Sequence, residues 1–66
     1  DGLDFYRKRT EGSRTYLKKG GLLIYEVGYK QGGSVKGILR KAGFEDISIL
    51  KDLQGHNRVV FGYKRN

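Results

Sequence analysis

The chain has 66 residues with no cysteine and one histidine, so it can form one domain or part of one, but neither a disulfide bond nor a zinc cluster. No apolar stretch approaches the roughly 20 residues needed to cross a bilayer, so we expect no membrane partner. The 14 basic residues against 7 acidic ones give a net charge of +7, which would attract nucleic acid, but their spread along the whole chain favours a solvated basic surface.

Residues 3–18 are predicted to form a helix that depends on tertiary contacts. Spacings of three and four place five side chains near one face: Leu3, Tyr6, Thr10, Ser13 and Leu17. Asp1 and Asp4 lie at the amino end, where the helix dipole favours negative charge. Gly20 or Gly21 would end the helix, because glycine accepts the left-handed conformation found there.

Residues 22–28 are predicted to form the strand around which the chain is organised. The stretch is apolar except at Glu26, which is typical of a strand with both faces covered, as in the middle of a parallel sheet. Such a strand needs neighbours on both sides, and a chain of 66 residues supplies few. We therefore expect residues 1–66 to form a single partial domain, a piece of a larger one.

Residues 28–33 are predicted to form a turn into a second helix. Ser34 would cap this helix through its hydroxyl oxygen, and Gly43 would end it. Its apolar stripe consists of Val35, Ile38, Leu39 and Ala42. Glycine-rich turns between a strand and a helix can bind phosphate, but this spacing is neither GxGxxG nor GxxxxGK[ST], so a plain turn is favoured.

Residues 46–52 and 58–64 are predicted to form two further strands. The connection between them contains Gly55 and Asn57, which suit a turn. It is too short for a parallel crossover, so these two strands must be antiparallel. The predicted order of elements is therefore α-β-α-β-β.

Three places could carry a function. The carboxylate of Glu26 lies near the carboxyl end of its strand, where open α/β sheets bind ligands, although a backbone amide or a lysine could equally satisfy it. Tyr25 and Tyr29, with Lys30, could stack on single-stranded nucleic acid, but core tyrosines are the more common reading. His56 lies in a turn without a nucleophile beside it, so no catalytic triad is indicated.

The order of several short motifs resembles the carboxyl-terminal third of the HemK-family release-factor glutamine methyltransferases. The matching stretches are GLDFYR (2–7), YLKKGGLLIYEVGYKQG (16–32) and AGFEDISILKDLQGHNRVVFG (42–62). The resemblance implies an α/β fold, a fragment of a class I, Rossmann-like methyltransferase sheet. The strands at 22–28, 46–52 and 58–64 would then lie in the order first, third, second, with the last one antiparallel.

The same resemblance implies that the full-length parent is an enzyme that uses S-adenosylmethionine to methylate the glutamine of a Gly-Gly-Gln motif in peptide chain release factors. The cofactor loop and the Asn-Pro-Pro-Tyr motif of the family precede the matched part, and this chain contains no proline. No catalytic, cofactor-binding or metal-binding residue is therefore assigned, and we expect the fragment alone to be inactive, without tight binding of the cofactor. Glu26, Gly28 and Gln31 match positions near the rim of the pocket, where they would have a supporting role.

Two alternatives remain open from the residues themselves. The net charge and the tyrosines would fit a small basic RNA-binding module, with Lys30 and Arg58 among its contacts. A non-catalytic subdomain that self-associates through the exposed edge of strand 22–28 is the other alternative. The lack of cysteine fits the reducing cytoplasm, which is the expected localisation.

Overall fold

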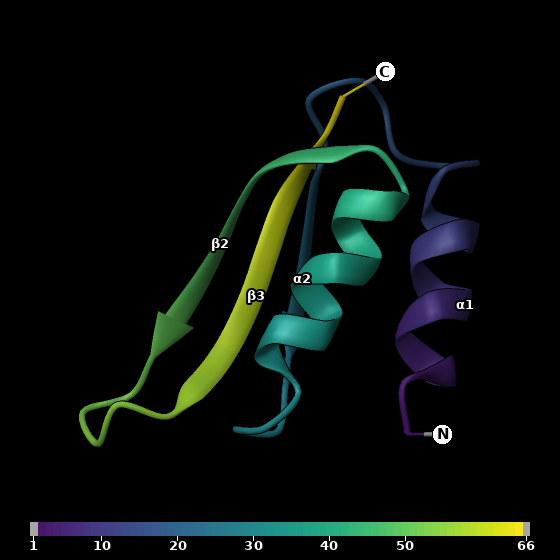
Figure 1. Cartoon of the computed structure of the whole chain (residues 1–66). Helices are drawn as coiled ribbons and strands as arrows, with labels where there is room; N and C mark the ends of the chain where they lie inside the picture. Colours follow the sequence, from purple (N-terminus) through teal and green to yellow (C-terminus); the bar gives the residue numbers. More distant parts are fainter. Residues whose placement is uncertain (1, 66) are drawn as a thin grey trace.

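The computed structural model describes residues 2–65, and Asp1 with its expected place at the helix start lies outside this range. Within it, the elements run in the order α1 (Asp4–Ser13), β1 (Leu22–Glu26), α2 (Gly32–Lys41), β2 (Phe44–Lys51) and β3 (Asn57–Lys64) (Figure 1). This confirms the α-β-α-β-β order predicted from the sequence. Neither of these helices is long and apolar enough to cross a membrane.

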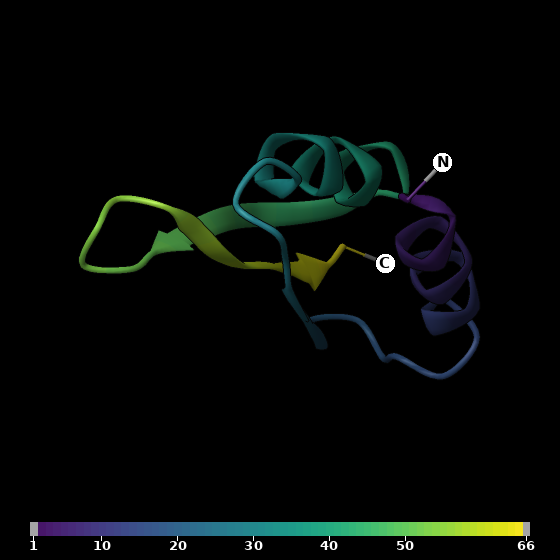
Figure 2. The ribbon, with the colours of Figure 1, turned by 90° about the horizontal axis from the view of Figure 1, so that it is seen from below.

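The three strands described form one sheet in the order β1-β3-β2, as the sequence resemblance predicts. β3 pairs antiparallel with both neighbours, so Phe61 lies opposite Ile24 on one side and Ser48 on the other. Figure 1 shows α2 in front of the sheet with α1 beside α2, and Figure 2 shows α2 over the strands from a second direction. The result is the α/β arrangement expected of a methyltransferase sheet fragment.

The core lies between α2 and the sheet. Val35 and Leu39, four positions apart on α2, are completely buried, and so is Val60 on the facing side of β3. The remaining buried apolar side chains of this cluster are Tyr25, Val27 and Phe44. α2 therefore covers one face of the sheet along the stripe that its sequence predicts.

The inner stripe of α1 is confirmed, including its two polar members. Thr10 and Ser13 are buried, and Leu3, Tyr6 and Leu17 pack partly against the core. The Thr10 hydroxyl lies 2.8 Å from the Tyr25 hydroxyl, and the Ser13 hydroxyl donates a hydrogen bond of 2.7 Å to the Thr10 carbonyl. These bonds satisfy the hydroxyl groups, so the stripe is buried without unpaired polar atoms.

α1 ends at Ser13, five residues before the predicted end. Beyond it the backbone tightens into turns, with the N–H of Tyr16 bonded to the carbonyl of Ser13 at 3.2 Å. The Lys64 ammonium group then donates hydrogen bonds of 2.8 and 2.6 Å to the carbonyl oxygens of Arg14 and Leu17. A side chain from the last strand thus takes the carbonyl groups that a longer helix would have used, and it places a positive charge where the helix dipole favours one.

α2 begins at Gly32, two residues before its predicted cap at Ser34. Gln31 occupies the position before the helix, and the structure shows no side-chain cap there, so the prediction that Ser34 caps the helix is wrong. The cause is the turn, in which the N–H of Gln31 bonds to the carbonyl of Gly28 at 2.8 Å and brings the backbone into the helix at once. Gly43 ends the helix with φ 91°, as predicted.

β2 begins at Phe44 rather than residue 46, and it contains a bulge. The register with β3 shifts between Glu45 and Ser48, and Asp46 within the shift has φ 51°. An extra residue in one strand bends and twists it, which carries Phe44 under α2 while the hairpin extends away from the core (Figure 1). The predicted strand, 46–52, therefore lacks Phe44 and Glu45, the first two residues of β2.

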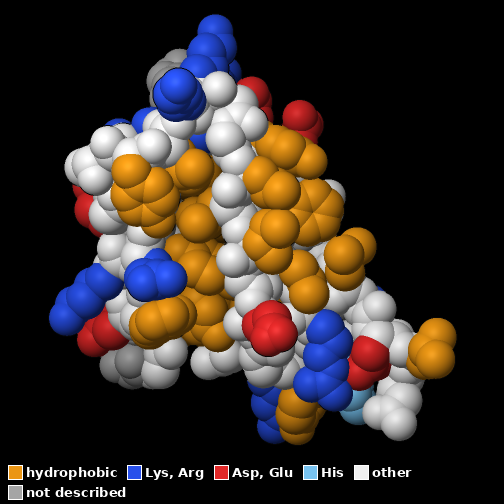
Figure 3. Space-filling view, turned by 180° about the vertical axis from the view of Figure 1, so that it is seen from behind, with side chains coloured by type: hydrophobic (Ala, Val, Ile, Leu, Met, Phe, Trp, Pro, Cys, Tyr) orange, Lys and Arg blue, Asp and Glu red, His pale blue; other side chains and the backbone are white. Residues whose placement is uncertain are grey.

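The face of the sheet opposite α2 is uncovered within residues 2–65. Figure 3 shows a broad apolar area on this side. We call it the open face, and by strand register it consists of Leu22, Ile24, Leu50, Val59, Phe61 and Tyr63. Ile24 and Leu50 are more than half exposed. The prediction that strand 22–28 has cover on both faces is thus met on one face only, and β1 pairs on one edge only with the described strands.

Candidate functional site

The three residues predicted at a pocket rim lie together at the carboxyl end of β1. The backbone N–H of Gly28 donates a hydrogen bond of 3.0 Å to the side-chain oxygen of Gln31. The Tyr6 hydroxyl lies 3.3 Å from that same oxygen and 3.1 Å from the carbonyl oxygen of Glu26, so it can donate to either. The Gln31 side chain therefore closes the turn after β1, and Tyr6 ties the turn to α1.

The Glu26 carboxylate needs no buried partner. Glu26 pairs with Val59 in the register and shares the face of Ile24, and its side chain is exposed. An exposed carboxylate keeps its water, so the cost of burial that singled out this residue does not arise in the described part of the chain. What the position offers is a negative charge at the rim of the open face.

The turn between β2 and β3 is held by Asp52. One carboxylate oxygen accepts the backbone N–H groups of Gln54 and His56 at 2.9 Å each, and the other accepts the Arg58 guanidinium at 2.7 Å. The bond from the His56 amide, followed by the bond from Arg58, lowers the pKa of Asp52 from 3.8 to about 2. Asp52 is therefore ionised at neutral pH, and Gly55, with φ 85°, completes the turn as predicted.

An aromatic pair joins this hairpin turn to the turn after β1. The rings of Tyr29 and His56 have centroids 5.2 Å apart, and the Lys30 ammonium group lies 5.5 Å from the centroid of the Tyr29 ring. Tyr29 is half exposed. The sequence does not predict this pair, because Tyr29 and His56 belong to separate turns that meet only once β3 is paired with β1.

The predicted stacking surface of Tyr25 with Tyr29 does not form. Tyr25 is 7% exposed and Tyr29 is 53% exposed, so only the second can meet a ligand. Burial raises the pKa of Tyr25, and the hydrogen bond from Thr10 opposes this effect. The common interpretation of a core tyrosine is thus the correct one for Tyr25.

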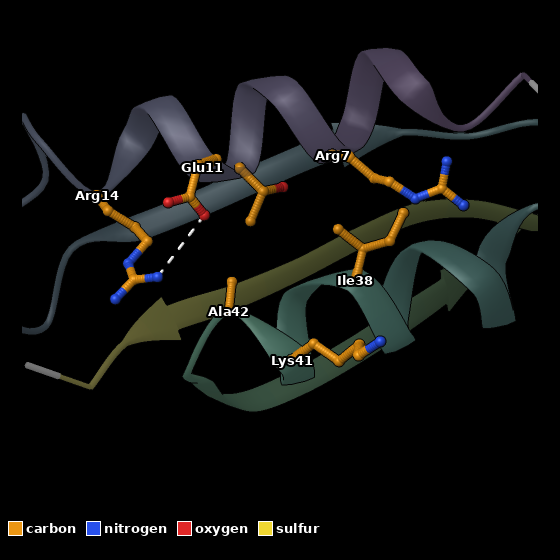
Figure 4. A pocket seen from close by; sticks show the side chains of 7 residues that line it. Arg7, Glu11, Arg14, Ile38, Lys41 and Ala42 are labelled. Carbon is orange, nitrogen blue, oxygen red and sulfur yellow. Dashed lines mark ion pairs between the residues drawn. The ribbon is translucent and has the colours of Figure 1, made fainter.

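A groove between α1 and α2 hollows the surface of the described residues. Its volume is about 240 Å³, and Figure 4 shows the side chains that line it: Arg7, Thr10, Glu11, Arg14, Ile38, Lys41 and Ala42. Arg14 and Glu11 form an ion pair of 3.7 Å across one end. Arg14 and Lys41 lie where α1 and α2 end, so their charges offset the negative ends of the two helix dipoles. The charged side chains that line the groove therefore have a structural role at the helix ends.

Among residues 2–65, no three His, Cys, Asp or Glu side chains gather in a way that could hold a metal ion.

Comparisons with known proteins point to one family of enzymes, although no family model matches the chain. The chain is 43% identical over 60 residues to a release factor glutamine methyltransferase of Cereibacter sphaeroides, which covers 91% of this chain and 22% of that protein. It is 44% identical over 64 residues to the protein of that name from Clostridium acetobutylicum, covering 97% of this chain and 22% of the relative. A bifunctional methyltransferase of Rickettsia felis is 42% identical over 60 residues, which is 91% of this chain and 11% of that protein.

A solved structure shows the same relationship. The crystal structure of a release factor-specific protein-(glutamine-N5) methyltransferase from Alicyclobacillus acidocaldarius matches 100% of this chain and 42% of its own, with a TM-score of 0.77 and 31% identity. The chain spans about a fifth of the length of the first two curated relatives. Over nearly its whole length, the chain is thus similar in sequence and fold to one part of the release factor glutamine methyltransferases.

Proposed function

We propose that this chain forms part of the catalytic domain of an enzyme that transfers a methyl group from S-adenosylmethionine to a glutamine side chain of a peptide chain release factor. The observation that carries the proposal is the agreement of sequence and fold. Identity of 43–44% extends over 91–97% of the chain, and the backbone superposes on a solved enzyme of this specificity with a TM-score of 0.77. Translation termination would place such an enzyme in the cytoplasm.

The residues of this chain do not fit S-adenosylmethionine by themselves. The turn after β1 is where a ligand would meet backbone N–H groups, but the N–H of Gly28 is already bonded to Gln31. The groove between the helices is lined mainly by charged side chains at the helix ends. We therefore assign cofactor binding and catalysis to residues outside this chain, and propose that the 66 residues alone transfer no methyl group.

The contribution of this chain is a structural frame beside the reaction site. The open face and the unpaired edge of β1 provide apolar side chains and backbone groups against which the rest of a domain can pack. Glu26, Gly28 and Gln31 would support the rim at the carboxyl end of β1, Gly28 and Gln31 by fixing the shape of the turn. Self-association through the same edge is the competing use of this surface.

A chimeric enzyme tests the proposal. In the Alicyclobacillus enzyme, the segment that this chain matches is replaced by the 66 residues, and methyl transfer from radiolabelled S-adenosylmethionine to a release factor is measured. The chimera should methylate the release factor, whereas the chain alone and the enzyme without the segment should not. A folded chimera without activity would refute the proposal, and activity of the chain alone would refute the assignment of catalysis to other residues.

A further inference from the structure

An exposed aromatic surface lies at the end of the sheet where β1 and β2 finish. Tyr29 comes from the turn after β1 and His56 from the hairpin turn, and their ring centroids are 5.2 Å apart. Tyr29 is 53% exposed, and Leu53 in the same hairpin turn is fully exposed. Exposed tyrosine is enriched where proteins bind partners, because a rigid ring supplies a large contact area at low entropic cost.

Both turns that carry this surface are held in place. The turn after β1 is closed by the bond from the Gly28 amide to Gln31, and the hairpin turn by the bonds to Asp52. The start of α2 also touches the start of β3 so closely that a Cβ added to Gly32 would lie 2.5 Å from the Asn57 side-chain nitrogen. A surface that is fixed before binding loses little entropy when a partner arrives.

The charges around the rings favour a polypeptide over a nucleic acid. Lys30 lies 5.5 Å from the Tyr29 ring, and Arg58 lies 2.7 Å from Asp52 in the hairpin turn. Asp52 is ionised, with a pKa of about 2, and Glu26 is exposed on the strand that leads into the first turn. Asp52 offsets the charge of Arg58, and Lys30 and Lys51 stand against Glu26, so little of the +7 of the chain gathers at this patch to attract phosphates.

We propose that the surface formed by Tyr29, Lys30 and His56 is a docking site for the protein substrate, the release factor that carries the glutamine. This inference rests on the proposed function. It adds that this chain contributes to substrate affinity through contacts beside the reaction site, at the carboxyl end of a strand where α/β sheets bind ligands. Tyr29 and His56 are binding residues here, with no part in the chemical step.

The kinetics of the chimera described above test the inference. Tyr29→Ala and His56→Ala should each raise the KM for the release factor about tenfold and leave kcat within about twofold, because truncating an anchor of an interface weakens binding by this order. Tyr29→Phe should restore the KM, since it keeps the ring. Tyr16→Ala is the matched control, because Tyr16 is 66% exposed but follows α1, and its KM should stay within about twofold of the parent value.

Three results would overturn the inference: equal KM values for Tyr29→Ala and Tyr16→Ala, a fall in kcat without a change in KM, or competitive inhibition by an RNA oligonucleotide that Tyr29→Ala relieves. The last result would assign the surface to nucleic acid. A folded chimera without activity refutes the proposed function instead, and binding of release factor to the surface is then tested by titrating the isotope-labelled chain with release factor. Shifts of the amide signals at Tyr29 and His56 support the docking site, and their absence at the highest soluble concentration overturns it.

Discussion

The hydroxyl pair of Thr10 and Tyr25 offers the sharpest test of how α1 is attached to the sheet. Their oxygens are 2.8 Å apart, Thr10 is 1% exposed and Tyr25 is 7% exposed. The other contact of the Tyr25 hydroxyl is a long one of 3.5 Å to the carbonyl of Tyr6. We therefore expect each hydroxyl to depend on the other for its hydrogen bond.

Removing one hydroxyl should cost more than removing both. Tyr25→Phe leaves the Thr10 hydroxyl buried without its partner, and Thr10→Val leaves the Tyr25 hydroxyl with only its long bond to the Tyr6 carbonyl. Each should therefore lower the free energy of unfolding by about 1–3 kcal/mol. A loss of about 2 kcal/mol corresponds to a Tm lower by roughly 8–16 °C for a domain of this size. The double variant has two apolar groups in contact instead, with no unpaired hydroxyl, so its free energy of unfolding should be close to that of the parent.

Thermal and urea unfolding of the four proteins, followed by circular dichroism, gives the double-mutant cycle. Tyr16→Phe is the control, because Tyr16 is 66% exposed and the loss of its hydroxyl should leave the Tm unchanged. The cycle should yield a coupling energy of about 0.5–3 kcal/mol. Additive losses in the double variant would refute the reasoning, since they would mean that the two hydroxyls do not satisfy one another.

Three further predictions concern single positions. Gly32→Ala should destabilise the chain by about 1–3 kcal/mol, because the added Cβ meets the Asn57 side chain. A Cβ at Gly33 meets nothing within 4 Å, so Gly33→Ala should stabilise α2 by up to about 1 kcal/mol through its higher helix propensity. Urea unfolding of both variants measures the two effects. Asp46→Val should lower the free energy of unfolding by about 1–2 kcal/mol, because φ is 51° at this position and strains a β-branched side chain. Asp46→Gly should not lower it, since glycine adopts this conformation freely. Thermal unfolding of both variants checks this. The pKa of Asp52 is about 2 in the folded chain, against 3.8 in the unfolded one, so its ionised carboxylate stabilises the fold fully above pH 3.8 and loses this effect as the pH falls toward 2. The difference in unfolding free energy between the parent and Asp52→Asn should therefore shrink over that range.

Each of these has an outcome that contradicts it. Equal effects of alanine at positions 32 and 33 would mean that the close approach of α2 and β3 does not restrict the backbone. A tolerated valine at position 46 would mean that the positive φ at this position does not strain a β-branched side chain. A constant difference between the parent and Asp52→Asn at all pH values would show that Asp52 titrates in the folded state as it does in the unfolded chain.

The order of elements and the strand order could be predicted because they depend on short-range signals and on family resemblance. The stripe of α2 through Val35 and Leu39 follows from helical spacing, and both are completely buried. The short connection after Asp52 permits only an antiparallel hairpin, and β2 and β3 form one. The placement of β3 between the other two strands came from the resemblance, since no local signal specifies it.

The ends of the elements and the aromatic surface could not be predicted, because distant residues determine them. α1 stops where Lys64, 50 positions away from Arg14, takes its carbonyl groups. The start of α2 is the exception, since a local bond sets it: the N–H of Gln31 bonds to the Gly28 carbonyl and brings the backbone into the helix at once. The pairing of Tyr29 with His56 depends on the register between β1 and β3, which the alternation of apolar residues does not reveal.

The contact between Lys64 and the end of α1 also gives the chain an order of assembly. During synthesis α1 emerges first, yet the side chain that binds its last carbonyl groups follows 47 to 50 positions later. Bringing such distant segments together requires closing a long loop, so the contact with Lys64 should form later than the shorter-range contact of Thr10 with Tyr25. The segment after α1 therefore lacks this partner in the growing chain until residue 64 has left the ribosome, and mutations at Lys64 should act on this segment more than on the Thr10–Tyr25 contact.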